Sequence, residues 1–205
     1  ADAWTASWRD RDHALPPAQA ADALVLTYSC ARQARLAGRH VDVLLGPIVR
    51  ALESAGRKAH VWEFSAVEPY RFPRATPSYP VQRPFYSIQL ARALFPRLPK
   101  NAELPGYEGI RDLLVARGRF YSVLERDRLL REFGHILSLR DYFNRLLDRI
   151  NPAVAFTANV SRYEMALYLA CHERRIRSVE VQHGTQGEVH GEYARWTRVP
   201  PEGYE

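Results

Sequence analysis

The stretch AVAFTANVSRYEMALYLACHERRIRSVEVQ, residues 153–182, decides the fold class. Its two ends, AVAFT at 153–157 and SVEVQ at 178–182, are short runs rich in β-prone residues, and both are predicted as strands. Between them, Ser161 and Glu164 have the S-x-x-E spacing of a capping box, which predicts a helix from there to about residue 175. A strand, a helix and a second strand joined by short connections are typical of a parallel sheet.

The amino-terminal part of the chain repeats this order. Residues 24–28 (LVLTY) and 59–64 (AHVWEF) are predicted as buried strands. Apolar residues at helical spacing predict a helix over 41–55, and Gly56 is placed to end it. We therefore expect four parallel strands in one sheet, covered by helices at 41–55 and 161–175.

The remaining segments define the expected domain organisation. Residues 1–22 are a lead-in segment, and residues 23–205 form one lobe. Within that lobe we predict that 65–150 is a proline-rich loop followed by a helical insertion, because five prolines interrupt 69–84 and apolar residues recur at helical spacing up to Ile150.

Composition and motifs exclude several classes of protein. The 205 residues are 46% hydrophobic and 25% charged, which is ordinary for a globular protein. No apolar run approaches the roughly 18 residues that a membrane-spanning helix needs. Cys30 and Cys171 match no metal-ligand spacing, and two cysteines predict a reducing, cytoplasmic setting. The sequence holds no phosphate-binding loop of the Walker or dinucleotide type and no G-x-S-x-G nucleophile elbow.

The charge balance leaves two alternatives open. The formal net charge is +6, and all basic residues except Lys58 and Lys100 are arginines, dispersed along the chain. They are either salt-bridged surface residues or a basic face for an anionic ligand, because arginine pairs bidentately with phosphates and carboxylates.

The strongest local signal is QHGTQGEVHG at 182–191, directly after the last predicted strand. Its glycines allow close backbone approach, and His183, Glu188 and His190 are candidate catalytic residues because they can hydrogen-bond or exchange protons. The alternative is a glycine-rich turn in which His183 is satisfied by backbone groups. The segment has no recognised metal-ligand spacing, so we expect no metal site.

A second candidate lies after the first predicted strand. Ser29 and Arg32 follow residues 24–28, at the edge of a parallel sheet where α/β proteins bind ligands. We interpret them as donors for an anionic or polyhydroxylated ligand; the alternative is a solvated, arginine-rich loop.

The segment from Asn151 to Gly184 carries a resemblance to a known family. A strand, a helix rich in small apolar residues and a strand leading into Gln182-His183-Gly184 resemble the amino-terminal lobe of bacterial GT-B glycosyltransferases. Within that family, the segment is most similar to enzymes of capsule and lipopolysaccharide O-antigen biosynthesis. It covers about 150–205 and, less closely, 22–64, and implies a Rossmann-like α/β lobe.

The resemblance also implies a function. The chain would be the acceptor-side lobe of an enzyme that transfers a sugar from a nucleotide-sugar donor, without another cofactor, to a growing surface polysaccharide or lipopolysaccharide. The ligand-binding residues would be Ser29, Arg32, Gln182, Gly184 and Thr185, with His183, Glu188 and His190 as the catalytic candidates.

Further expectations concern the setting of such a lobe. A basic chain suits contact with lipid-linked acceptors at the anionic inner face of the cell membrane. Because the chain runs from Ala1 to Glu205 with no second lobe, we expect a fragment that is inactive alone. The alternative is a non-catalytic, arginine-rich α/β module that binds nucleic acid or a partner protein, although no nucleic-acid-binding motif is present.

Overall fold

A computed structural model describes residues 20–32, 34–64, 73–99, 101–118 and 124–181 of the chain. Its centre is a five-stranded sheet in the order β5-β4-β1-β6-β7. The strands are β1 (Ala23–Tyr28), β4 (Ala59–Phe64), β5 (Tyr79–Pro80), β6 (Val154–Thr157) and β7 (Arg177–Glu180). Every pairing in this sheet is parallel. The fold is therefore α/β and Rossmann-like, as the sequence predicts.

Both faces of the sheet are buried, which explains why its central strands are almost wholly apolar. Along β1, Leu24 and Leu26 belong to the larger core cluster, whereas Val25 between them belongs to the smaller one. Along β4, Trp62 likewise faces the larger cluster and Val61 the smaller. This alternation places one apolar layer on each side of the sheet.

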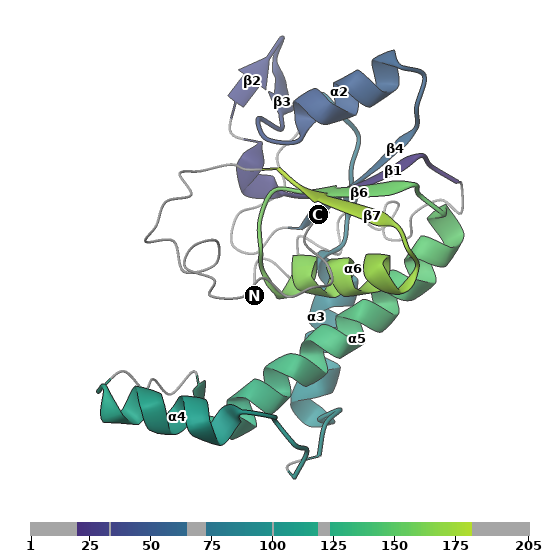
Figure 1. The fold of residues 1–205 in the computed structure, drawn as a ribbon. Helices are drawn as coiled ribbons and strands as arrows, with labels where there is room; N and C mark the ends of the chain where they lie inside the picture. Colours follow the sequence, from purple (N-terminus) through teal and green to yellow (C-terminus); the bar gives the residue numbers. More distant parts are fainter. Residues whose placement is uncertain (1–19, 33, 65–72, 100, 119–123, 182–205) are drawn as a thin grey trace.

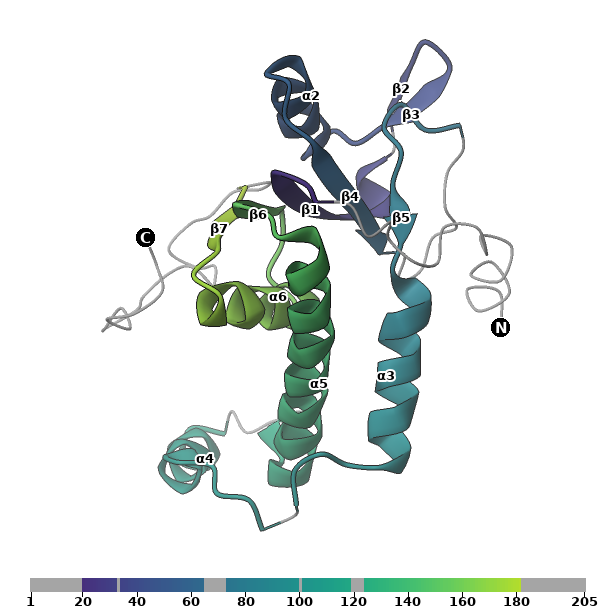
Figure 2. The ribbon, with the colours of Figure 1, turned by 90° about the vertical axis from the view of Figure 1, so that its right-hand side faces the viewer.

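Helices cover the two faces unequally (Figures 1 and 2). Of the described helices, α2 (Gly46–Ser54) is the one that covers the first face. Helices α3 (Gln82–Leu94), α5 (Arg126–Ile150) and α6 (Arg162–Glu173) lie on the other. The crossovers β1–α2–β4 and β6–α6–β7 run in opposite directions across the sheet, so right-handed connections place their helices on opposite faces.

The predicted ends of two helices are confirmed. At α6, the Ser161 hydroxyl accepts a hydrogen bond from the Tyr163 backbone, and the Glu164 side chain accepts one from the Ser161 backbone, so the capping box is complete. After α2, Gly56 has φ +70°, the left-handed conformation that ends helices.

Two short segments differ from the sequence expectations. Residues 34–41 form an antiparallel hairpin of β2 (Ala34–Leu36) and β3 (Arg39–Val41), so the helix predicted from residue 41 begins only at Gly46. The hairpin turn is made by Ala37 and Gly38, both at positive φ. Helical spacing was misleading here because Val41 belongs to the strand β3, where it pairs with Ala34.

The range 65–150 contributes directly to the sheet and its core. Its proline-rich part includes β5, which pairs with the edge of β4. Its helical part includes α3, α4 (Tyr107–Ala116) and α5. Phe85 of α3 and Phe143 of α5 are fully buried in the larger core cluster. Among the described residues, no helix is long and apolar enough to cross a membrane.

Candidate functional site

The strand order determines where a ligand site is expected. β1 lies at the centre, with β4 on one side and β6 on the other, and the chain reverses its direction across the sheet between β1 and β6. In such sheets, ligands bind beyond the carboxyl ends of the strands at this reversal. Two polar clusters lie there: the Arg32 cluster (Arg32, Glu63, Arg74 and Ser78) and the Tyr28 cluster (Tyr28, Ser161 and Glu164).

The Arg32 cluster is built around one buried carboxylate. Glu63, near the carboxyl end of β4, accepts hydrogen bonds at Oε2 from Arg32 Nε (2.7 Å) and from the Ser78 hydroxyl (2.6 Å). Arg74 Nε lies 3.6 Å from the same oxygen, and its Nη1 donates to Ser78 Oγ at 2.9 Å. Two guanidinium groups therefore lie against the same carboxylate oxygen.

Arg32 is the group in this cluster best suited to an additional ligand. Its side chain is 0% exposed, and within the described part of the chain neither Nη1 nor Nη2 has a hydrogen-bond partner. A buried polar group that makes no hydrogen bond lowers the stability of the folded protein by roughly 1–3 kcal/mol, and a charged group lowers it by more. An anionic oxygen, from a phosphate or a carboxylate, would satisfy both atoms at once.

Hydrogen bonds of Asp42 and His40 fix the backbone around Arg32. Asp42 accepts hydrogen bonds from the Thr27 hydroxyl (2.5 Å) and from the backbone N–H groups of residues 44 and 45 (2.8 and 2.9 Å). The buried ring of His40 lies with Nδ1 3.1 Å from the Arg32 carbonyl oxygen. The hairpin and the start of α2 thus fix the position of Arg32 relative to the end of β1.

The Tyr28 cluster lies on the other side of β1. The Tyr28 hydroxyl donates to Glu164 Oε1, and the Ser161 hydroxyl donates to Glu164 Oε2 at 2.5 Å. Burial raises the pKa of Glu164 and outweighs the hydrogen bonds from Ser161 and Tyr28, which lower it. Burial and the nearby Glu164 charge also raise the pKa of Tyr28 well above its usual range. Glu164 is a buried acid that positions Tyr28 at the reversal point.

Of the candidate site residues predicted from the sequence, the structure describes two. Ser29 and Arg32 are both buried at the carboxyl end of β1, so the solvated-loop alternative is wrong for them. Arg35 and Arg39 are exposed, but they lie in the β2–β3 hairpin and not in a loop. The other candidates lie outside the described residues: Gln182, His183, Gly184, Thr185, Glu188 and His190.

Sequence analysis missed the partners that make the site. Glu63 was available as a signal, because a carboxylate within the apolar run AHVWEF requires a buried counter-charge. Ser161 and Glu164 were recognised, but only as a helix cap. Nothing local in the sequence marks Ser78 or Arg74 as neighbours of Arg32.

The surface arginines favour one of the two charge alternatives. Most arginines with ion pairs lie on the surface and face a nearby carboxylate: Arg57–Asp22, Arg97–Asp141, Arg111–Glu108, Arg140–Glu173, Arg162–Glu132 and Arg174–Asp148. For these six arginines the salt-bridged alternative holds. No group of three metal-ligating side chains occurs in the described ranges.

The fold is a Rossmann-like parallel α/β domain, with a buried arginine at the carboxyl edge of its sheet. No protein-family model and no curated protein match the chain. Among solved structures, it is similar to UDP-GlcNAc 2-epimerase from Methanocaldococcus jannaschii, with 12% identity, a TM-score of 0.37 and coverage of 82% of this chain and 33% of that one.

A second solved structure is similar to the same degree. The UDP-GlcNAc 2-epimerase from Neisseria meningitidis bound to UDP-GlcNAc has 10% identity and a TM-score of 0.38, and the alignment covers 85% of this chain and 35% of that one. The chain thus spans about a third of the length of either epimerase. Similarity at this level assigns neither a family nor an activity.

Proposed function

We propose that this chain is the acceptor-side lobe of a glycosyltransferase that moves a sugar from a nucleotide-sugar to a growing surface polysaccharide or lipopolysaccharide. The observation that carries the proposal is the buried Arg32 at the carboxyl end of β1, with both Nη atoms unpartnered among the described residues. A guanidinium in this position suits the phosphate or carboxylate groups of sugar substrates.

Different residues at this edge of the sheet would contact the anionic group and the hydroxyl groups of a sugar substrate. Arg32 donates a hydrogen bond from Nε to Glu63, so its two Nη atoms can donate to an anionic ligand. Tyr28 and Ser161, at the reversal point beside it, place hydroxyl groups that can contact sugar hydroxyls. Because Arg32 is fully enclosed, ligand binding requires that the groups covering it move aside.

The chemical step remains assigned from the sequence resemblance alone. Transfer with inversion needs a base that takes the proton of the acceptor hydroxyl. His183 is our first candidate to line the cleft, followed by Glu188 and His190. Further ligand contacts would come from Ser29, Gln182, Gly184 and Thr185. The setting we propose is the cytoplasm, at the inner face of the cell membrane, where lipid-linked acceptors are available.

The test is an activity assay on the full-length gene product. Purified protein is incubated with UDP-, GDP-, dTDP- and CMP-activated sugars and with lipid-linked saccharides extracted from the source cells, and release of the nucleotide is measured. We expect release from one donor only when an acceptor is present. Arg32→Lys keeps the ion pair with Glu63 but loses the two-pronged guanidinium, so kcat/KM should fall by about 10²-fold.

The matched control is Arg149→Gln, which removes an exposed arginine of α5 far along the chain from the site. It should leave kcat/KM unchanged. Failure of every donor and acceptor pair, or equal activity of Arg32→Lys and the wild type, overturns the proposal. A saturable gel shift with RNA or DNA in the absence of transfer would support the nucleic-acid-binding alternative instead.

A further inference from the structure

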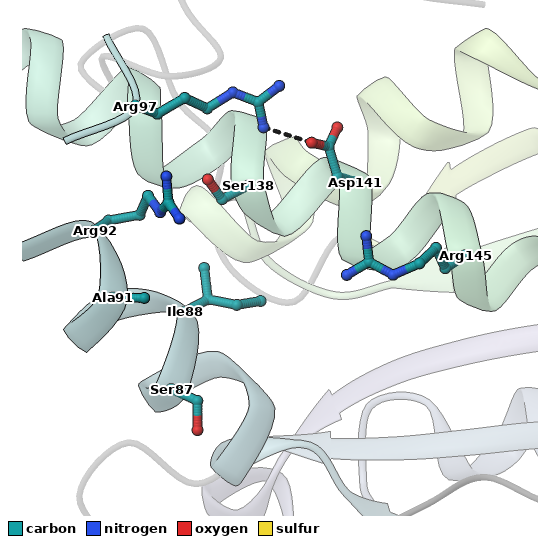
Figure 3. A pocket seen from close by; sticks show the side chains of 8 residues that line it. All are labelled: Ser87, Ile88, Ala91, Arg92, Arg97, Ser138, Asp141 and Arg145. Atoms are coloured by element: carbon teal, nitrogen blue, oxygen red, sulfur yellow. Dashed lines mark hydrogen bonds and ion pairs between the residues drawn. The ribbon is translucent and has the colours of Figure 1, made fainter. Parts of the chain in front are cut away.

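Helices α3 and α5 run side by side (Figure 2), and residues of both helices line a pocket of about 400 Å³ (Figure 3). Three arginines line it: Arg92 of α3, Arg97 just after α3, and Arg145 of α5. One carboxylate, Asp141, and the hydroxyls of Ser87 and Ser138 complete its polar lining. The volume is within the range of small-molecule sites, which begins at roughly 300 Å³. We call this site the arginine pocket.

The carboxylate in the pocket is already neutralised. Arg97 Nη1 lies 2.5 Å from Asp141 Oδ2, and Arg140 Nη2 donates to Asp141 Oδ1 at 2.8 Å. Burial alone would raise the pKa of Asp141, but the hydrogen bonds from Arg140 and Arg97 outweigh it and the net shift is downward. Asp141 therefore stays ionised with both oxygens occupied, and it is not available to the other arginines.

Arg92 and Arg145 are left without a counter-charge. Neither has an ion pair in the described part of the chain, and Arg92 Nε is buried without a hydrogen-bond partner among those residues. Figure 3 shows the two side chains extending into the space between α3 and α5 from opposite sides. Two like charges facing one space repel each other, and a bound anion would remove both the repulsion and the unmade hydrogen bond.

The pocket walls hold this geometry in place. The segment after α3 approaches α5 closely at Gly134, where an added Cβ would lie 3.4 Å from the Cβ of Arg97. Arg97 Nη1 also donates to the Leu137 carbonyl oxygen at 3.1 Å, which ties the end of α3 to α5. The site is therefore formed by packed helices rather than by one flexible side chain.

We infer that the arginine pocket binds a phosphate monoester through Arg92 and Arg145. A phosphate monoester carries about −1.5 to −2 charges at neutral pH, which matches the two uncompensated guanidinium groups. Its three terminal oxygens can accept from both arginines and from the Ser87 hydroxyl in the lining. The same chemistry occurs in soluble sugar or glycerol phosphates and in phosphatidic acid. This site is separate from the Arg32 cluster and does not depend on the proposed glycosyl transfer.

The test compares two sources of the phosphate group. Binding of glycerol 3-phosphate to residues 1–205 is measured by calorimetry, and binding to phosphatidylcholine vesicles with and without phosphatidic acid is measured by flotation. We expect saturable binding of glycerol 3-phosphate. Arg92→Gln and Arg145→Gln should each weaken it at least about tenfold, because each removes a charged donor to phosphate.

Arg149→Gln is the matched control, because it removes one charge from the same helix without touching the pocket. Arg145 is exposed, so its substitution should not affect folding, which circular dichroism checks. Vesicle binding that requires phosphatidic acid and is lost in Arg145→Gln identifies a lipid as the source, whereas binding of glycerol 3-phosphate alone identifies a soluble phosphate. The inference is overturned by absence of saturable binding to both probes, or by equal weakening in Arg149→Gln.

Discussion

Arg32 Nε and Glu63 Oε2 lie 2.7 Å apart, and neither side chain is exposed to solvent. The pair joins the turn after β1 to the neighbouring strand β4, at the edge of the sheet where a ligand is expected. A buried ion pair is costly to desolvate, and its main effect appears when one partner is removed and the other charge is left alone.

Substitution of Glu63 is therefore expected to destabilise the protein strongly. Glu63→Gln removes the carboxylate charge that faces the fully buried Arg32, which should lower the free energy of unfolding by about 3–5 kcal/mol. Urea denaturation followed by circular dichroism measures this. Glu108→Gln, which breaks an exposed pair with Arg111, should have little effect. Equal stability of Glu63→Gln and the wild type would show that the buried pair is not formed.

Glu164 should make stability fall as the pH rises. Its pKa is raised in the folded protein, chiefly by burial, so the folded state keeps a proton that the unfolded chain has already lost. Its contribution is fully present below the unfolded pKa and is lost as the pH rises through the folded one. The free energy of unfolding of the wild type minus that of Glu164→Gln should therefore decrease as the pH rises above about 4, where the unfolded chain begins to lose this proton.

Tyr28→Phe provides a matched variant for this titration. The Tyr28 hydroxyl donates to Glu164 and lowers its pKa, so its removal should move the loss of stability to higher pH. A difference between wild type and Glu164→Gln that stays flat or increases with pH contradicts the prediction.

His60 should produce the opposite dependence. Burial, assisted by the charge of Lys58, lowers the pKa of His60, so the folded state binds its proton less readily than the unfolded chain does. Its contribution to stability is present above the unfolded pKa and is lost as the pH falls. His60→Phe keeps the stacking on Tyr79, whose ring centroid lies 5.7 Å away, but cannot titrate.

The measurement is again a difference between two proteins. The free energy of unfolding of the wild type minus that of His60→Phe should decrease as the pH falls below about 6.5, where the unfolded histidine takes up its proton. Lys58→Gln removes the smaller of the two causes and should make this decrease shallower. Parallel pH profiles for wild type and His60→Phe would mean that His60 is not desolvated in the folded state.

The sequence by itself determined the strands at the centre of the sheet and the start of α6. LVLTY and AHVWEF are apolar because both faces of those strands are buried, and that pattern is visible in a few consecutive residues. The capping box depends on two residues three positions apart, Ser161 and Glu164, and was predicted correctly for the same reason. Both features depend on residues that are close together in the sequence, so the sequence alone predicts them.

Only the tertiary structure decided the β2–β3 hairpin, the strand β5 and the composition of both sites. β5 is two residues long and becomes a strand only because the edge of β4 is open to pair with it. Arg32 and Glu63 are 31 positions apart, and Arg97 and Asp141 are 44 apart. Their contacts arise from how helices and strands pack, and no spacing in the sequence encodes which arginines keep a free charge once that packing is complete.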